Sequence, residues 1–269
     1  MSGKKERQRK LARERMLRQQ ARRAERARKA RQITIVAVIC CVVAGLGVGG
    51  YFLFAGPGSS KAAAVSATSS ATPSASASTQ AEPATTCSYQ ASGTAARNVG
   101  TPPAKPDYKA VYQATIHTNR GDVVINLLNS KATCTVGSFV YLAAKKYFNG
   151  THCHRLTTID PFVLQCGDPT GTGSGGPGYK FANENLAGAT YTRGTVAMAN
   201  SGPNTNGSQF CIVYKNSKLA ASYTPFGEVV KGLGIIQNVA KAGSDNANAA
   251  GDGHPKEKVV IESVTIKKT

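Results

Sequence analysis

The run from Ile33 to Ala55 contains no charged residue, and this limits the architectures open to the chain. As a helix with a rise of about 1.5 Å per residue, such a run spans about 35 Å, which is enough to cross the hydrocarbon core of a bilayer. The apolar run of a cleavable signal peptide is shorter. We therefore interpret residues 33–55 as a transmembrane signal anchor that divides the chain between two compartments.

The segment before this run is strongly basic. Residues 1–31 hold 14 Lys and Arg against three Glu, so they carry +11 of the chain's formal net charge of +19. Basic residues beside a membrane span stay on the cytoplasmic side. We therefore interpret residues 1–32 as a cytoplasmic tail near anionic lipid, in a single-pass protein of the cell membrane. Nucleic-acid binding by this tail stays open as an alternative that we do not expect, because no aromatic residue interleaves with its charges.

The chain beyond the apolar run changes composition twice. Residues 56–86 are mainly Ala, Ser, Thr and Pro, which cannot bury a core and which predict a flexible tether. Residues 87–106 are intermediate in character and read as extended chain leading into a domain, so the whole linker is 56–106. The folded domain is predicted at 107–269, outside the cytoplasm, and we expect it to be monomeric there.

This predicted domain is mainly β. Runs at 111–117 and 123–128 are joined by Asn119-Arg120-Gly121-Asp122, which is a hairpin signal. Apolar residues with helical spacing predict a helix over 133–147. Further short strands are expected at 153–157, 162–166, 195–199, 209–214, 226–230 and 259–266, with a second helix at 232–240. Short strands with many Gly turns and few helices predict a barrel or a sandwich.

Three stretches carry the chemistry of the domain. The first contains Cys153-His154-Arg155-Leu156 and ends with Gln165-Cys166-Gly167-Asp168, the second runs from Gly194 to Phe210, and the third is Pro225-Phe226-Gly227-Glu228-Val229. In this order and spacing they resemble the cyclophilin family of peptidyl-prolyl cis-trans isomerases, over about residues 110–269. The resemblance implies a closed eight-stranded antiparallel barrel capped by two helices. It also implies proline-containing polypeptides as clients, and neither a metal nor another cofactor.

The resemblance implies roles for particular residues. Arg155 matches the catalytic donor, Gln165 the residue that orients it, and Phe162 the floor of an apolar pocket for the proline ring. Substrate-binding positions carried over in the same way are Val163, Ala199, Asn200, Gln209, Cys211, Leu219 and Tyr223. Rotation of an X–Pro bond breaks amide resonance, at a cost of about 18–20 kcal/mol. A fixed cationic donor aimed at the prolyl nitrogen would stabilise the twisted state more than either ground state.

The chain also departs from the family pattern around this pocket. The loop 157–160 is two residues longer than usual. Cys211, Val163 and Tyr223 stand where the family usually has Phe, Met and His, and Lys218 stands where a Trp is common. These substitutions predict a looser and less aromatic pocket. A non-catalytic module that only binds proline-containing segments therefore stays open as an alternative to an isomerase that serves exported or envelope proteins.

The cysteines of the domain suggest disulfides, because oxidation is expected outside the cytoplasm. Cys153 and Cys166 lie on neighbouring predicted strands joined by the longer loop, so we expect them to pair. Cys87 could join Cys134 at the start of the first helix, which would leave Cys211 unpaired. Five free, buried thiols stay open as the alternative.

Three other patterns in the domain resemble ligand sites but lack a feature that each site requires. Residues 171–176 match the dinucleotide-binding spacing of glycines, but no helix follows them. The run His152–His154 has no second cluster of ligands at zinc-site spacing. The segment 243–253 contains Asp252 and other polar residues, but it fails the spacing of a calcium loop, so we interpret it as a surface loop.

Overall fold

The structure is a computed structural model that describes residues 84–269. The predicted tail at 1–32 and the predicted anchor at 33–55 lie outside the described residues. Within 84–269, no helix has the length and apolar character that a membrane span requires.

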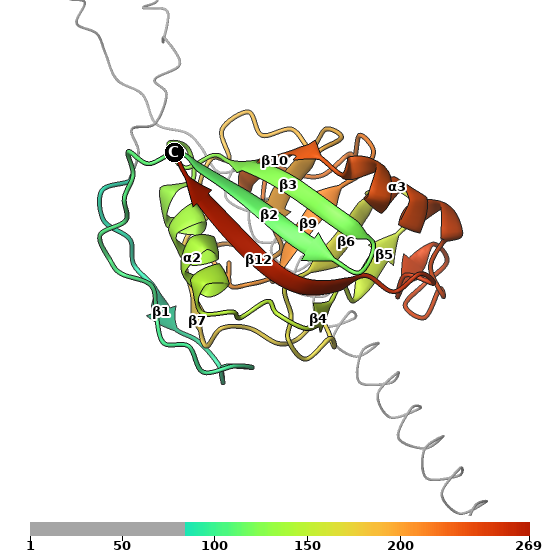
Figure 1. Ribbon diagram of the computed structural model, residues 1–269, viewed down its shortest axis with the longest axis horizontal. Helices are drawn as coiled ribbons and strands as arrows, with labels where there is room; N and C mark the ends of the chain where they lie inside the picture. The colour runs from blue at the N-terminus through green and yellow to red at the C-terminus, as the bar shows by residue number, and fades with distance from the viewer. Residues whose placement is uncertain (1–83) are drawn as a thin grey trace, which may run out of the picture. The chain divides into compact units, whose positions relative to one another are not determined.

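Ten strands form one antiparallel sheet in the order β11-β5-β6-β9-β8-β10-β3-β2-β12-β4, and the sheet curls strongly (Figure 1). Its strands are β2 (Tyr112–Thr118), β3 (Gly121–Leu127), β4 (Thr151–His152), β5 (Arg155–Thr157), β6 (Val163–Cys166), β8 (Thr195–Met198), β9 (Phe210–Val213), β10 (Pro225–Lys231), β11 (Asp252–Gly253) and β12 (Val260–Lys268). A separate pair is formed by β1 (Gln90–Ala91) and β7 (Tyr179–Lys180). The helices are α2 (Thr133–Ala144) and α3 (Leu233–Ala242), which lie toward opposite ends of the sheet in the view of Figure 1.

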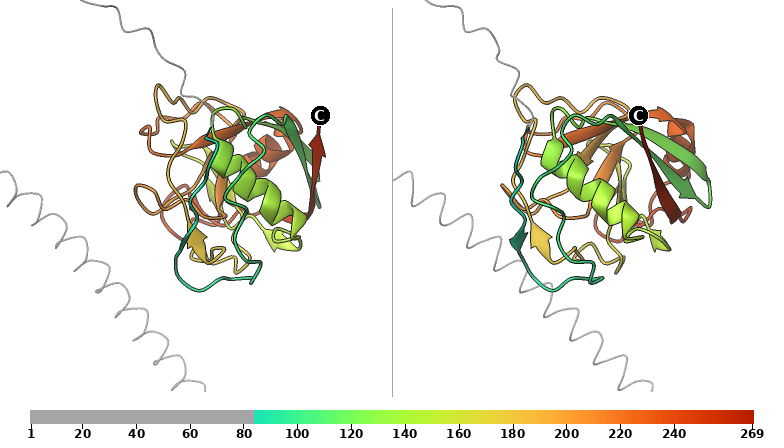
Figure 2. Two further views of the ribbon diagram at one scale, coloured as in Figure 1. Left: turned by 90° about the vertical axis from the view of Figure 1, so that its left-hand side faces the viewer. Right: turned by 60° about the vertical axis from the view of Figure 1, so that its left-hand side comes forward.

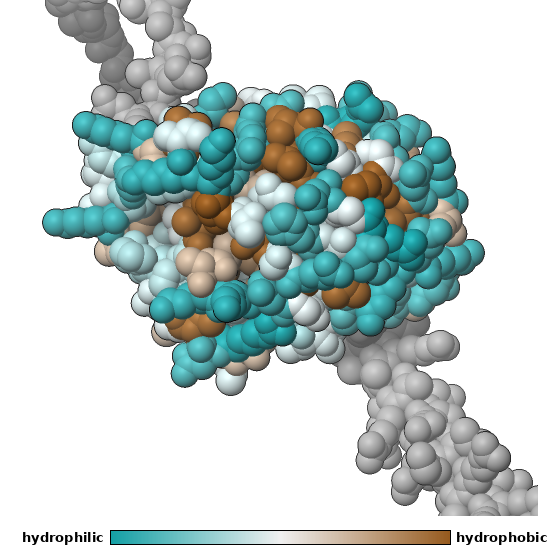
Figure 3. Space-filling view, viewed as in Figure 1, coloured by the Kyte–Doolittle hydropathy of each residue, from teal (hydrophilic) through white to brown (hydrophobic). Residues whose placement is uncertain are grey.

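The predicted hairpin is present as β2 and β3, with Thr118 paired to Gly121 across the turn. Alternate residues of both strands point inward, and Ile116 and Ile125 are at most 2% exposed. This is the period-two pattern that a sheet with one buried face requires. The outer face of this region is largely hydrophilic and carries apolar side chains only in separate patches (Figure 3).

The expectation of a closed eight-stranded barrel is wrong in strand number and in closure. The sheet order ends at β11 and β4, which do not pair with each other within residues 84–269. β4 and β5 are separated only by Cys153 and His154. The N–H of Cys153 donates to the carbonyl of Val259 at 3.0 Å, and that of His154 donates to the carbonyl of Gln165 at 3.0 Å. Closure would need this segment to pair with both neighbours along its whole length, whereas its first half pairs with β12 and its second half with β6.

An aromatic core holds α2 against the concave side of the sheet. The ring of Phe139 on α2 lies 5.2 Å from that of Phe148, 5.6 Å from that of Phe210 and 5.4 Å from that of Phe226, centroid to centroid. All four side chains are at most 3% exposed. Burial of aromatic rings on this scale is the main favourable term in folding a domain of this size.

The start of α2 is capped from a distant part of the chain. Ala132, at the N-cap, has no side chain that could accept a hydrogen bond. Instead the carboxylate of Glu184 accepts from the backbone N–H of Cys134 at 2.9 Å and from that of Thr135 at 2.7 Å. A negative charge at a helix N-terminus is favourable because the exposed N–H groups and the helix dipole are positive there.

The residues that the sequence suggested as a lead-in, 87–106, pack on the domain. Cys87 is bonded to Cys134 on α2, and the hydroxyl of Tyr89 donates to the carbonyl of Cys134 at 2.8 Å. Arg97 Nη1 donates to the carbonyls of Tyr147 and Asn149, each at 2.8 Å. Figure 2 shows this segment running alongside α2. Below, residues 87–106 are called the N-terminal extension.

Candidate active site

An apolar cavity of about 210 Å³ opens at β6, β8 and β9. Eight of the ten catalytic and substrate-binding residues predicted from the sequence line it. The full lining is Arg155, Pro161, Val163, Gln165, Ala197, Met198, Ala199, Asn200, Cys211, Val213, Leu219 and Tyr223.

Strand register brings these side chains to one wall. Val163 lies opposite Val213 and Gln165 lies opposite Cys211 in the β6–β9 ladder, so all four alternate onto the same face. Ala197 of β8 lies opposite Cys211 on the other side of β9. Sequence reasoning missed Val213 and Ala197. Both lie two residues from a predicted site residue, so the period of a strand could have found them.

Phe162, which was predicted as the floor of the pocket, is not among the residues that line this cavity. It lies one position before Val163, so strand alternation turns its side chain to the opposite side. Its ring lies 6.0 Å from that of Tyr214, and the ammonium group of Lys215 lies 4.4 Å from its centroid. The apolar surface of the cavity comes instead from the side chains of Val163, Val213 and Leu219.

A chain of hydrogen bonds links the polar groups at the rim. Arg155 Nη1 donates to Gln165 Oε1 at 3.4 Å, which is a long contact, and Gln165 Nε2 donates to Gln209 Oε1 at 2.8 Å. Gln209 in turn donates to the carbonyls of Gly173 at 3.0 Å and Gly175 at 2.9 Å. Gln209, which was predicted to bind substrate, is not among the residues that line the apolar cavity. It links Gln165 to the glycine-rich loop of residues 171–176.

The glycine-rich loop is organised by the buried carboxylate of Asp168, which has no exposed surface. It accepts from the backbone N–H of Thr170 and Gly173, each at 2.7 Å, and from that of Gly175 at 3.0 Å. Burial raises the pKa of Asp168, but the Thr170 hydroxyl and these N–H groups outweigh it, so the pKa lies below its ordinary value. The glycines of 171–176 thus serve a structural anion, which explains the pattern that resembled a nucleotide site.

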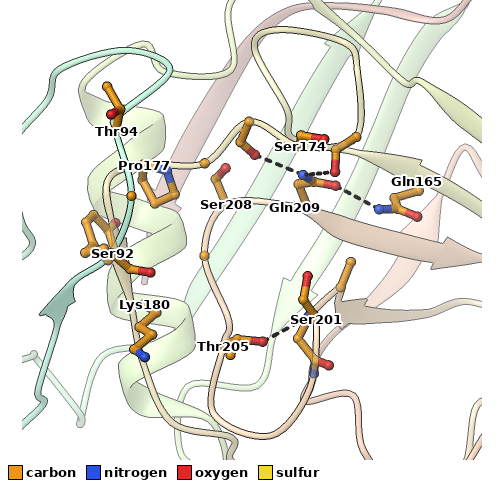
Figure 4. Close-up of a pocket in the computed structure, with 18 residues that line it drawn as sticks. Ser92, Thr94, Gln165, Ser174, Pro177, Lys180, Ser201, Thr205, Ser208 and Gln209 are labelled. Atoms are coloured by element: carbon orange, nitrogen blue, oxygen red, sulfur yellow. Dashed lines mark hydrogen bonds between the residues drawn. The ribbon is translucent and has the colours of Figure 1, made fainter. Parts of the chain in front are cut away.

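A second cavity of about 550 Å³ adjoins the first and is lined mainly by Gly, Ser, Thr, Asn and Gln. The two cavities share Gln165, Ala199 and Asn200. Figure 4 shows Gln209 on one side of this space and Ser92, Thr94 and Pro177 on the other. The N-terminal extension therefore supplies a wall of the larger cavity, which the sequence did not indicate.

The far wall of the apolar cavity is supported by Tyr191, which is 2% exposed. The Tyr191 hydroxyl donates to the carbonyl of Tyr223 at 2.8 Å and accepts from the N–H of Tyr223 at 3.0 Å. Leu219 and Tyr223 pack on the small apolar cluster to which Tyr191 and Val213 belong. This arrangement places Tyr223 in the wall although it lies in the loop before β10 and not in a strand.

A family model described as "Cyclophilin type peptidyl-prolyl cis-trans isomerase/CLD" matches residues 113–266. The chain belongs to the cyclophilin family. It is 44% identical to a probable peptidyl-prolyl cis-trans isomerase B of Mycobacterium leprae, over 67% of this chain and 66% of that protein. This chain is also 46% identical to a probable peptidyl-prolyl cis-trans isomerase B of Mycobacterium tuberculosis, over 60% of this chain and 56% of that protein. The chain thus spans just under two thirds of the first relative and just over half of the second.

A solved structure shares the fold. The crystal structure of a Cryptosporidium parvum cyclophilin-type peptidyl-prolyl cis-trans isomerase, obtained in the presence of the dipeptide Ala-Pro, is 32% identical to this chain with a TM-score of 0.52. The match covers 58% of this chain and 99% of that structure. The matched share is in keeping with a cyclophilin domain that occupies the C-terminal part of a longer chain.

Both disulfides that the sequence suggested are formed in this cyclophilin, Cys87–Cys134 and Cys153–Cys166. The second lies directly behind the site, since Cys166 follows Gln165 on β6. Among the described residues, Cys211 is the free cysteine.

Burial shifts the pKa of two further groups near the cyclophilin site, Cys211 and His154, toward their neutral forms. Burial raises the pKa of the Cys211 thiol to about 12, against the opposing effect of the Arg155 charge. The ring nitrogens of His154 are buried without a hydrogen-bond partner, and burial lowers its pKa. No group of three His, Cys, Asp or Glu side chains in residues 84–269 is placed to bind a metal ion. Within the lining of the apolar cavity, Arg155 is the cationic side chain.

Proposed function

We propose that this chain accelerates cis-trans rotation about X–Pro peptide bonds in polypeptide substrates. The observation that carries the proposal is the position of Arg155 and Gln165 in the wall of an apolar cavity of about 210 Å³. The cavity offers apolar surface to a proline ring, while the two polar side chains offer hydrogen bonds to the amide that must rotate. The family membership and the names of the mycobacterial relatives support the same reaction.

The chemistry needs neither a nucleophile nor a proton transfer. Rotation about an X–Pro bond is slow, about 10–100 s without a catalyst, because amide resonance must be lost. In the twisted state the prolyl nitrogen regains its lone pair and becomes a better hydrogen-bond acceptor. Arg155 is charged at every relevant pH and has five N–H groups, so it can donate to that nitrogen. A donor fixed beforehand stabilises the twisted state without reorganisation during the reaction.

The test measures, by NMR, the rate at which an X–Pro peptide exchanges between its cis and trans forms. The full-length chain is added in detergent micelles. A hydrogen bond to a charged donor contributes about 1.5–3 kcal/mol, so Arg155→Ala is expected to lower kcat/KM about 10- to 150-fold. Arg193→Ala, which removes an exposed Arg outside the cavity lining, serves as the control and should leave the rate unchanged.

The outcomes separate the isomerase from a module that only binds proline-containing segments. The substitutions at Cys211 and Tyr223 are what favour the binding module. If the parent chain binds an X–Pro peptide but does not accelerate exchange, the isomerase proposal fails and the binding module is supported. If the parent is active and Arg155→Ala is equally active, the mechanism proposed for Arg155 is wrong.

We further propose that residues 33–55 anchor this domain in the cell membrane, with residues 1–32 in the cytoplasm and the isomerase domain, as a monomer, outside. The uncharged run and the basic segment before it support the anchor. Two disulfides in the domain support an oxidising compartment, since such bonds are rare in the cytosol. Exported or envelope proteins are then the clients. The test is protease treatment of protoplasts, in which the wall has been removed and the membrane is intact. Digestion of the domain supports the orientation, and full protection refutes it.

A further inference from the structure

Asp252 lies outside the cavity lining but contacts Arg155 directly. Its Oδ1 accepts from Arg155 Nε at 2.9 Å, and its Oδ2 accepts from Arg155 Nη2 at 2.7 Å. We propose that Asp252 is a positioning residue for Arg155, which holds the guanidinium so that Nη1 is presented beside Gln165 in the cavity wall. The inference rests on the proposed isomerase function and names a residue that the sequence assigned to a surface loop.

The backbone around Asp252 is tied to the site. Asp252 pairs with Thr157 in the β11–β5 ladder. The N–H of Thr158, in the longer loop after β5, donates to the carbonyl of Gly251 at 2.7 Å, and Asn248 Nδ2 donates to Asp252 Oδ1 at 3.1 Å. The lengthened loop therefore provides the docking edge for the segment that delivers the carboxylate.

The far side of this segment is fastened by Asp245. Its Oδ1 accepts from the N–H of Ala247 at 3.0 Å and from the N–H of His254 at 2.8 Å. A Cβ atom added at Gly253 would lie 2.1 Å from that same oxygen, so only glycine permits the approach. Asp252 is thus fixed by hydrogen bonds on both sides, as a residue that orients another side chain must be.

The geometry assigns the donors of Arg155 to different tasks. Of its five N–H groups, Asp252 occupies Nε–H and one on Nη2, and those on Nη1 stay directed toward Gln165 and the cavity. A bidentate pair fixes the plane of the guanidinium, so less freedom is lost when a substrate binds. The carboxylate also weakens the positive field at the prolyl nitrogen. Because Arg155 is 40% exposed, water screens that effect, and we expect orientation to outweigh it.

The experiment compares Asp252→Asn with the parent chain in the NMR exchange assay. An amide offers one acceptor and places an N–H against Arg155, so kcat is expected to fall about tenfold, which corresponds to about 1.4 kcal/mol, with KM unchanged. Asp252→Glu keeps both acceptors and should recover part of the loss. Asp107→Asn is the control, because Asp107 pairs with Lys268 at 2.6 Å in a different surface ion pair.

A double-mutant cycle tests whether Asp252 acts through Arg155. In an Arg155→Lys background the bidentate guanidinium is absent, so Asp252→Asn should cause no further fall in kcat. Full activity of Asp252→Asn, or an equal second fall in that background, would overturn the inference. If Asp252→Asn does not fold, the cycle is run with Asp252→Glu. A loss of activity that occurs with Arg155 but not in the Arg155→Lys background supports the inference. A loss of activity in both backgrounds overturns it.

Failure of the proposed function is distinguishable from failure of this inference. If the parent chain shows no isomerase activity, the ¹⁵N-detected Nε–H signal of Arg155 still reports its orientation. Slow solvent exchange of that proton in the parent, and fast exchange in Asp252→Asn, would support positioning. Equal exchange in both chains would refute it whatever the activity.

Discussion

Removing the Cys87–Cys134 disulfide is expected to lower the free energy of unfolding by about 4 kcal/mol. The two cysteines are 47 positions apart, and the loss of chain entropy when a loop of that length is closed in the unfolded state corresponds to about 4 kcal/mol. Cys153 and Cys166 are only 13 positions apart, for which the same relation predicts about 3 kcal/mol. A natural domain is stable by about 5–15 kcal/mol, so either loss is a large share.

The assay is urea unfolding of the full-length chain in one detergent, followed by tyrosine fluorescence, since the sequence has ten Tyr and no Trp. Each pair is replaced by two serines, and the parent and Cys211→Ser serve as references. A loss below about 1 kcal/mol for Cys87→Ser/Cys134→Ser would refute the reasoning. So would a larger loss for the pair that closes the shorter loop. A confirmed loss would show that the N-terminal extension, which walls the larger cavity, is a stabilising part of the domain.

Three further outcomes are expected. Glu184→Gln should lower the free energy of unfolding by about 1–2 kcal/mol, because the N-terminus of α2 loses its anionic cap, whereas the exposed Glu262→Gln should not; urea unfolding measures both. Alkylation of Cys211, followed by mass spectrometry, should speed up about tenfold per pH unit toward a pKa of about 12, and a plateau near pH 9 would contradict this. Because the pKa of Asp168 is lowered on folding, its contribution to stability is present above about pH 4 and is lost as the pH falls through the folded-state value; Asp168→Asn should flatten that part of a stability–pH curve, and an unchanged slope would contradict it.

Local patterns in the sequence located much of the fold. Alternating apolar residues placed the β2–β3 hairpin, and helical spacing placed α2, although the helix ends at Ala144 rather than at 147. These features follow from interactions between near neighbours in the chain, so a short window contains the information. Closure of the sheet was not predictable in this way, because it depends on one segment changing its pairing partner at Cys153 and His154.

The site residues also divide into those that the local sequence indicates and those that depend on contacts in the folded domain. The motif order indicated Arg155 and Gln165, and period two on β6 and β9 explains why Val163 and Cys211 share a wall with them. Phe162 lies outside the cavity lining because it comes one position before Val163, and its ring packs beside Tyr214 on the main core.

Residues that support the site from a distance left no signal in the sequence. Asp252 is 97 positions from Arg155, and its carboxylate reaches the guanidinium only because two loops dock on each other. The N-terminal extension reaches the larger cavity only because Cys87 is bonded to α2 and β1 pairs with β7. Composition and periodicity establish which segments fold and which face each strand buries. Contacts between distant segments depend on register and docking, which arise only when the whole domain packs.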